Sequence, residues 1–242
     1  MMEKNTFLEH LQELRSRLLK SLFVVMACFL SLIYFSNDIY LLLSKPLLNF
    51  LPSGSSMIAT EVASPFLAPL KLTFFASLLI SMPFFLNQIW KFIAPGMYKN
   101  EKSLSFLVML SSLFLFYAGI LFTYLLVLPL VFNFFTGVAP DGILIMTDIS
   151  RYLDFVLSMM FAFSFAFEIP ILIFLLIWAG VTDSNSLRNK RPYVVIGCFA
   201  VGMLVTPPDV ISQSLLAIPA WLLFELGIVM ADLFVKKKEK EL

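Results

Sequence analysis

The chain alternates long apolar stretches with short polar segments, a pattern typical of membrane-spanning helices. A helix needs roughly 20 apolar residues to cross a bilayer core of about 30 Å. The candidate runs, each poor in charge, are Leu18–Phe35, Leu72–Phe92, Leu104–Phe135, Phe155–Ala179, Tyr193–Thr206 and Val210–Val235. They predict an all-α integral membrane protein with six transmembrane helices.

The last two of these runs are predicted to be short. Tyr193–Thr206 contains 14 residues, which at about 1.5 Å per residue extend over only about 21 Å. The final run contains Pro219 and is uncharged only from Val210 to Phe224. Two short helices that cross a locally thinned bilayer fit this pattern best, and a re-entrant pair is the alternative.

Composition supports a membrane protein and excludes several other classes. The chain is 60% hydrophobic and 14% charged, whereas a soluble domain usually has about 25% charged residues. A soluble enzyme, a secreted disulfide scaffold and a nucleic-acid binder are therefore excluded. The two cysteines, Cys28 and Cys198, lie in apolar runs, and His10 is the single histidine. These counts favour neither disulfides nor most metal and acid–base chemistry.

Basic residues mark one side of the predicted spans. Fourteen of the 17 Lys and Arg residues lie in the N-terminal segment, the second and fourth loops and the C-terminal tail. Since cytoplasmic loops are enriched in basic residues, both termini are predicted to be cytoplasmic. We expect residues 1–242 to form one membrane domain, in which residues 6–20 are an amphipathic lead-in helix and residues 236–242 a short charged tail.

Prolines predict that several of the helices bend. Pro83, Pro129, Pro170 and Pro219 fall inside the spans or at their ends. Each removes a backbone hydrogen bond from its helix, so the pattern favours a curved wall of helices over a straight bundle. The outer loops between the spans also contain prolines and apolar residues, and we expect them to form ordered caps.

The N-terminal segment combines an apolar stripe with regularly spaced charges. Thr6 and Glu9 match a capping box, and Glu9, Glu13 and Arg17 follow at intervals of four residues. A solvated lead-in helix with Glu13 paired to Arg17 explains this spacing. The alternative is a cytoplasmic docking face that offers carboxylates.

The loop between the second and third predicted spans carries one acidic residue. Its sequence from Trp90 to Lys102 contains the turn signal Pro95-Gly96 and the acid Glu101. Glu101 could simply balance the neighbouring lysines. Together with Glu13, however, it would provide two carboxylates beside apolar residues, which suits a ligand with paired guanidinium groups next to a hydrophobic stretch.

Two acidic residues and one amide lie inside or beside the later spans. Glu168 is the only charge between Phe155 and Val181, and a carboxylate at that depth is functional by default; a structural hydrogen bond to a carbonyl freed by Pro170 is the alternative. Asp209 is expected to form a turn or a helix N-cap. Gln213 is polar within an apolar helix and suits contact with a partner helix.

The familiar catalytic patterns do not occur in this sequence. It contains no H-E-x-x-H, G-x-S-x-G or P-loop string. We therefore expect no enzymatic activity, no cofactor and no metal site.

Six sequence strings resemble the TatC family, the multi-spanning receptor subunits of twin-arginine protein translocases. The strings are HLQELRSRL at 10–18, MIATEVASPF at 57–66, FIAPGMYKNE at 92–101, FEIP at 167–170, RNKRPY at 188–193 and VTPPDVISQ at 205–213. The resemblance covers residues 6–235. It implies a cupped arrangement of six helices in the bacterial cytoplasmic membrane and export of folded proteins driven by the proton gradient.

The resemblance also implies roles for individual residues. The signal-peptide-binding residues would be Glu13, Arg15, Phe92 and Glu101. Contacts with TatA- and TatB-type single-span partners would involve Met203, Leu204, Thr206 and Gln213. Pro46 in the first outer loop, Glu168 and Asp209 match further family positions. The expected partners are these single-span proteins, twin-arginine signal peptides, membrane lipid and further copies of the chain, without nucleic acid.

A small proton-coupled secondary transporter is the leading alternative from another class. Glu168 would then be the coupling site near the midplane of the membrane. The absence of a visible internal repeat in the sequence and the single mid-span charge count against this reading.

Overall fold

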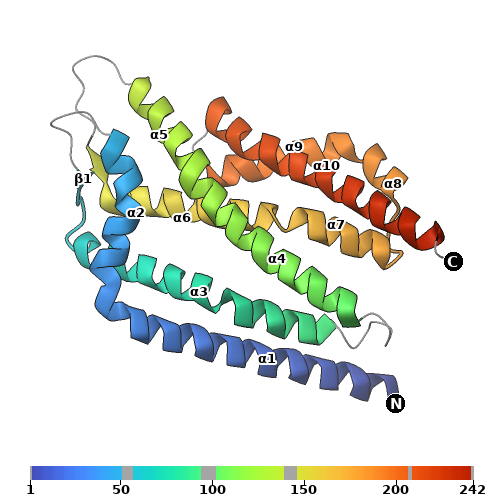
Figure 1. Ribbon diagram of the computed structural model, residues 1–242. Coiled ribbons are helices and arrows are strands. Elements are labelled where there is room, and N and C mark those ends of the chain that lie inside the picture. Colours follow the sequence, from blue (N-terminus) through green and yellow to red (C-terminus); the bar gives the residue numbers. More distant parts are fainter. Residues whose placement is uncertain (1, 51–56, 94–101, 139–145, 207–208, 241–242) are drawn as a thin grey trace. The chain divides into compact units, whose positions relative to one another are not determined.

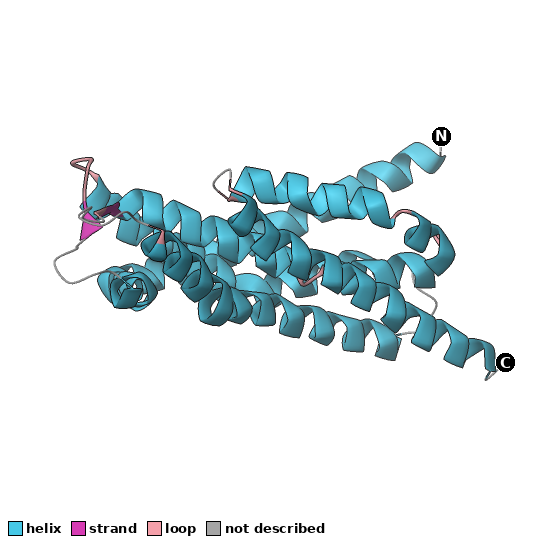
Figure 2. Ribbon diagram, turned by 90° about the horizontal axis from the view of Figure 1, so that it is seen from above, coloured by secondary structure: helices cyan, strands magenta, loops and turns pink. Residues whose placement is uncertain are grey.

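The structure is a computed structural model that describes residues 2–50, 57–93, 102–138, 146–206 and 209–240. It describes their side chains over residues 12–45, 57–91, 106–138, 146–206 and 209–233. Helices dominate this part of the chain (Figures 1 and 2). In chain order the elements are α1 (Met2–Leu32), the 3-10 turn η1 (Ile33–Phe35), α2 (Ser36–Phe50), β1 (Met57–Ile58), α3 (Ser64–Ile93), α4 (Lys102–Phe122), the π-helical turn η4 (Thr123–Val127), α5 (Leu128–Gly137), β2 (Thr147–Asp148), α6 (Ile149–Ala166), α7 (Ile169–Trp178), α8 (Ser184–Asn189), α9 (Arg191–Val205) and α10 (Val210–Lys240). The all-α membrane fold predicted from the apolar runs is confirmed.

The apolar helical segments coincide with the predicted spans. Those long and apolar enough to cross a membrane are Gln12–Lys45, Ser64–Lys91, Phe106–Gly137, Ile149–Trp178 and Val210–Leu233. The helix α9, which corresponds to the fifth predicted span, is a shorter apolar helix of 15 residues, so the short length predicted for it is confirmed.

The prediction of a short sixth span is wrong. The helix α10 continues through Pro219 and Glu225 and contains an apolar segment of 24 residues. Two physical reasons account for this length. A proline can remain inside a membrane helix where the surroundings satisfy the freed carbonyl, and the charge of Glu225 is neutralised by an arginine of α9 that is described below.

The first helix begins earlier than the capping box suggested. It starts at Met2, so Thr6 lies inside α1 and does not cap it. At its other end α1 passes through η1 directly into α2, which includes Pro46. Part of the segment that was predicted to be the first outer loop is therefore helical.

Two of the four span prolines coincide with irregular backbone. The π-helical turn η4 immediately precedes α5, in which Pro129 is the second residue. Pro170 is likewise the second residue of α7, after a break that separates α6 from α7 at Phe167 and Glu168. A proline lacks the N–H that an α-helix requires, so the chain changes its hydrogen-bond pattern before it. Pro83 and Pro219 lie inside continuous helices.

The described elements gather into two compact units, and each is considered by itself. The first unit comprises residues 1–45, 58–113 and 148–150. In it α1 and α3 lie side by side (Figure 1), and the rings of Phe29 and Phe74 meet edge to face with centroids 5.9 Å apart. The buried Thr73 donates to the Pro69 carbonyl oxygen at 2.8 Å, and Ser81 donates to that of Leu78 at 3.0 Å. These hydroxyls therefore satisfy their hydrogen bonds within their own helix, as an apolar environment demands.

Asp148 holds together the end of the first unit that lies next to the two-stranded sheet. Its Oδ2 accepts hydrogen bonds from the backbone N–H of Thr60 at 3.0 Å and from its hydroxyl at 2.6 Å. Its Oδ1 accepts from the backbone N–H of Ser150 at 2.9 Å, and the Ser150 hydroxyl bonds to that of Ser64 at 2.9 Å. Residues 88 positions apart in the sequence are thus joined beside the two-stranded sheet of β1 and β2.

The second unit comprises residues 46–57, 114–147 and 151–242. Two glycines bring its helices into close contact. A Cβ atom at Gly119 of α4 would lie 2.8 Å from the Phe163 carbonyl oxygen of α6, and one at Gly227 of α10 would lie 2.9 Å from the Pro170 Cα of α7. Close approach at small residues is the usual way that membrane helices gain packing energy.

Candidate functional site

Arg17 connects the N-terminal helix to the end of α3. Its Nε and Nη2 donate to Glu13 Oε1 at 3.1 and 2.5 Å. Its Nη1 donates to Gln88 Oε1 at 3.3 Å, and its Nη2 also donates to the Lys91 carbonyl oxygen at 3.2 Å. One guanidinium therefore joins a carboxylate of α1 to the last turns of α3, where the helix dipole favours a positive charge.

The pairing of Glu13 with Arg17 that the spacing predicted is confirmed. The side chain of Glu13 remains 37% exposed and that of Arg17 is 20% exposed. The additional bonds to Gln88 and Lys91 were not predicted, because more than 70 residues separate these partners in the sequence. The Glu13 carboxylate is consequently fixed in position next to the end of α3.

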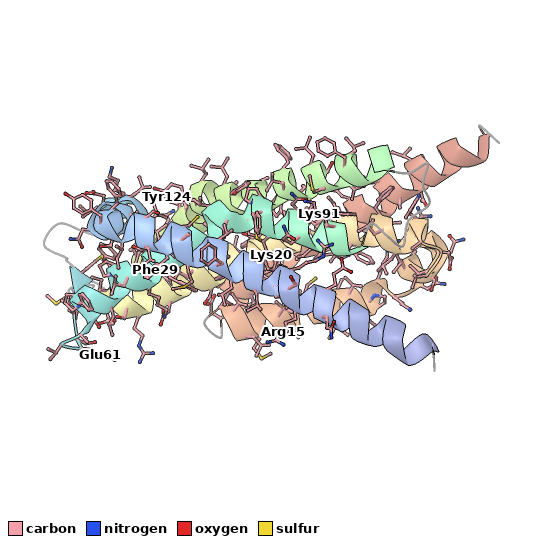
Figure 3. The ribbon with its side chains drawn as sticks, turned by 90° about the horizontal axis from the view of Figure 1, so that it is seen from below. Arg15, Lys20, Phe29, Glu61, Lys91 and Tyr124 are labelled. Atoms are coloured by element: carbon pink, nitrogen blue, oxygen red, sulfur yellow. The ribbon has the colours of Figure 1, made fainter. Side chains whose placement is uncertain are left out.

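Arg15 lies on a different part of α1. It is exposed, as is Lys20 (Figure 3), and both line a pocket that is bounded from α3 by Phe84. The structure therefore separates two arginines that are neighbours in the sequence: Arg17 lies against α3 with an acid, and Arg15 lies in a basic pocket.

The other two predicted signal-peptide residues fall where the structure gives no side-chain description. Phe92 belongs to the last turn of α3 by its backbone, but its side chain lies outside the described residues. Glu101 also lies outside them; in the sequence it directly precedes Lys102, the first residue of α4. Their roles remain predictions from the family resemblance.

A second set of ion pairs connects α8 and α9 to α10. Arg191 binds Glu225 as a two-pronged pair, with Nε–Oε1 and Nη2–Oε2 distances of 2.6 Å each. Arg188 donates to Asp232 Oδ2 at 2.6 Å. The sequence alone does not show this pair, because the two residues are 34 positions apart.

Reversing the charges of this pair tests whether it holds the last two spans together. Arg191→Glu and Glu225→Arg should each lower the thermal melting temperature of the purified protein, because each places two like charges together. The double variant should recover most of the loss. Lys190→Glu, at the exposed neighbouring residue, is the control and should melt like the parent chain. A double variant that melts as low as the single ones would contradict the pairing.

The predicted partner-contact residues differ in their exposure. Met203 and Leu204 of α9 are 61% and 87% exposed, whereas Thr206 is buried and donates to the Gly202 carbonyl oxygen at 2.9 Å. Gln213 of α10 is half-buried, and its backbone lies close to Gly202. Met203 and Leu204 are therefore exposed on α9, whereas the Thr206 hydroxyl is bonded within its own unit.

Asp209 and Glu168 occupy helix starts. Asp209 Oδ1 accepts from the Ser212 backbone N–H at 2.7 Å, so the prediction that Asp209 caps α10 is confirmed. Glu168 directly precedes α7, and its carbonyl oxygen accepts from the Leu172 N–H at 3.0 Å. The half-buried side chain of Glu168 stands at the break between α6 and α7.

These features define a multi-spanning helical membrane protein with a charged site where α1 meets the end of α3. Comparison with known proteins gives the family. The family model for TatC, the Sec-independent protein translocase protein, matches residues 9–219. The chain belongs to the TatC family.

Individual relatives match over almost the whole chain. A TatC protein from Azotobacter chroococcum is 58% identical over 219 residues, which cover 90% of this chain and 86% of the relative. TatC from Escherichia coli K12 is 53% identical, covering 94% of this chain and 88% of the relative. A crystal structure of the twin-arginine translocase receptor TatC superposes with a TM-score of 0.83 at 33% identity, covering 93% of this chain and 98% of that one.

Proposed function

We propose that this chain is the receptor subunit of a twin-arginine translocase and binds the leader peptides of folded proteins at the cytoplasmic side of the bacterial inner membrane. Family membership and the similarity to the receptor structure support this function. The distribution of Lys and Arg supports a multi-pass orientation with both termini cytoplasmic. In this role the protein binds and releases its cargo and performs no catalysis.

The observation that carries the proposal is the setting of Glu13. The carboxylate is held against the end of α3 and already accepts two N–H groups from a guanidinium, that of Arg17. The position of the Glu13 carboxylate therefore suits a guanidinium group, and a twin-arginine leader carries two of these groups. An arginine of the leader can share this carboxylate or replace Arg17.

We assign the arginine pair to Glu101 and Glu13, and a contact with the hydrophobic part of the leader to Phe92. A hydrogen bond to a charged group contributes about 1.5–3 kcal/mol before salt screening. Because two such contacts give only moderate affinity, apolar contact must supply much of the rest. Arg15 cannot pair with a cationic leader, so its contribution is indirect and concerns the position of α1.

The assembly with partner proteins involves the other unit. The exposed Met203 and Leu204 support contact of α9 with TatA- and TatB-type single helices, to which Gln213 contributes a polar group. Glu168, Pro46 and Asp209 match further family positions, and we propose that several copies of the chain take part in a proton-driven translocase.

Export of a folded reporter and photo-crosslinking of its leader test this proposal. Glu101→Ala and Glu101→Gln should each lower leader crosslinking at least about tenfold, since a lost charged contact of about 1.4 kcal/mol corresponds to that factor. Glu13→Gln should have a smaller effect in the same direction, because Arg17 already screens that carboxylate. Glu61→Gln, at an exposed acid of the same unit, is the control. Wild-type export and crosslinking in both Glu101 variants would reject the assignment.

A further inference from the structure

The pocket beside Arg15 has a composition that the leader-binding site does not explain. It has a volume of about 660 Å³ and is lined by one face of α1 together with Phe84 of α3. Arg15 and Lys20 contribute two positive charges, and none of the described residues that line the pocket is acidic. A leader with an arginine pair would be repelled here, so the pocket selects the opposite charge.

The lining residues change from polar to apolar along the helix. Arg15 lies near one end and Lys20 in the middle, and Phe23 and Val24 follow on the same face one turn further on. From Arg15 to Val24 the helix rises by about 13 Å at 1.5 Å per residue. Lys20 is also the last charged residue before an uninterrupted neutral run from Ser21 to Asn37. The pocket therefore spans the transition from the membrane surface to the hydrocarbon region.

The surrounding surface of α1 faces away from the protein. Only 11% of the apolar 18-residue window in the first candidate span is buried, and Phe23 and Leu19 are 75% and 55% exposed. In a membrane-spanning helix, an apolar face with this exposure suits contact with lipid tails. A ligand that enters the pocket from the membrane thus meets apolar side chains with its tail and cations with its head.

We propose that this pocket binds one anionic phospholipid from the leaflet on the N-terminal side, the inner leaflet in the orientation given above. The phosphate lies between Arg15 and Lys20, and the start of an acyl chain lies over Phe23, Val24 and Phe84. This assignment rests on a match between pocket and lipid. The basic residues of the pocket are followed by apolar ones, as the charged headgroup of the lipid is followed by its acyl chains. The lipid fixes the depth of α1 in the membrane and so gives Arg15 a positioning role beside Glu13.

Native mass spectrometry of the full-length chain, released from detergent with added lipid, tests this site. We expect phosphatidylglycerol to be retained in preference to phosphatidylcholine. Arg15→Gln with Lys20→Gln should weaken phosphatidylglycerol retention at least about tenfold, since each basic residue near an anionic surface contributes about fivefold. Lys91→Gln, which removes an exposed charge outside the pocket, is the control and should retain the lipid like the parent chain.

Two further arms locate the site and identify its ligand. A photoreactive phosphatidylglycerol should attach to peptides that contain Phe23 or Phe84, and Phe84→Ala should reduce this labelling. Inorganic phosphate or glycerol phosphate in excess should not displace the lipid, because neither has an acyl chain. Equal retention of the two lipids, an equal loss in Lys91→Gln, or displacement by phosphate would overturn the proposal. No leader is present, so the result is independent of the leader-binding function.

Discussion

Replacing Gly119 with valine is expected to prevent the second unit from folding stably. A Cβ atom at this position would lie 2.8 Å from the Phe163 carbonyl oxygen and 2.9 Å from the Ser164 Cα. Both atoms belong to the backbone of α6, which cannot rotate away as a flexible side chain would. Overpacking of this kind costs about 1–3 kcal/mol or more. Thermal melting in detergent should show a large fall for valine and a smaller one for alanine.

A second glycine provides the control for this substitution. Gly197 of α9 has no atom within 4 Å of the position that its Cβ would take. Gly197→Val makes the same glycine-to-valine change within a helix, but no neighbouring backbone lies close to the new side chain. This variant should therefore have a melting temperature close to that of the parent protein. A Gly119→Val variant that also melts like the parent would show that α4 and α6 do not approach as described.

The second large effect is expected at Asp148, at the end of the first unit next to the two-stranded sheet. Asp148→Ala removes three hydrogen bonds, two to Thr60 and one to the start of α6 at Ser150. Because the site is partly solvated, we expect a loss of roughly 2–3 kcal/mol, below the sum of three charged hydrogen bonds. This corresponds to a fall in melting temperature of about 4–12 °C for a protein of this size.

The melting temperature of Asp148→Asn should lie between those of the parent protein and Asp148→Ala, because an amide keeps one acceptor oxygen but loses the charge. Glu61→Ala removes an equal charge one residue away from Thr60 and should change the melting temperature little, because Glu61 is exposed. Equal losses in Asp148→Ala and Glu61→Ala would indicate that net charge, and not the hydrogen bonds, stabilises this end.

Local features of the fold were predictable from the sequence. Apolar runs located the membrane helices because a bilayer imposes a minimum helix length, and Pro170 marked the break between α6 and α7 because proline cannot donate a backbone hydrogen bond. The spacing of Glu13 and Arg17 predicted their pairing, which lies within one helix. Each of these features depends on residues only a few positions apart.

Features that depend on distant residues were not predictable in this way. The bond from Arg17 to the Lys91 carbonyl, the pair of Arg191 with Glu225 and the bonds of Asp148 to Thr60 all join separate helices or loops. The length of the apolar part of α10 was predicted too short from its charge-free stretch, because hydropathy alone could not show that Arg191 neutralises Glu225. The basic pocket appeared only when α3 brought Phe84 next to α1.

The structure also refines the candidate site. Two arginines of one sequence string have different surroundings: Arg17 pairs with Glu13 against α3, and Arg15 lies in a pocket without a described acid. A substitution of Arg17 would therefore disturb the carboxylate that we assign to the leader. A substitution of Arg15 would act through the position of the helix in the membrane.

The most direct test of the central claim measures leader affinity in a double-mutant cycle. A twin-arginine leader and a leader with glutamines in place of both arginines are titrated against the reconstituted receptor and its Glu13→Gln, Glu101→Gln variant. We predict that loss of the arginines weakens binding at least about tenfold for the parent receptor, but changes it little for the variant, which no longer carries the two carboxylates. An equal loss on both receptors, or equally tight binding of both leaders to the parent, would contradict the capture of the arginine pair by these two glutamates.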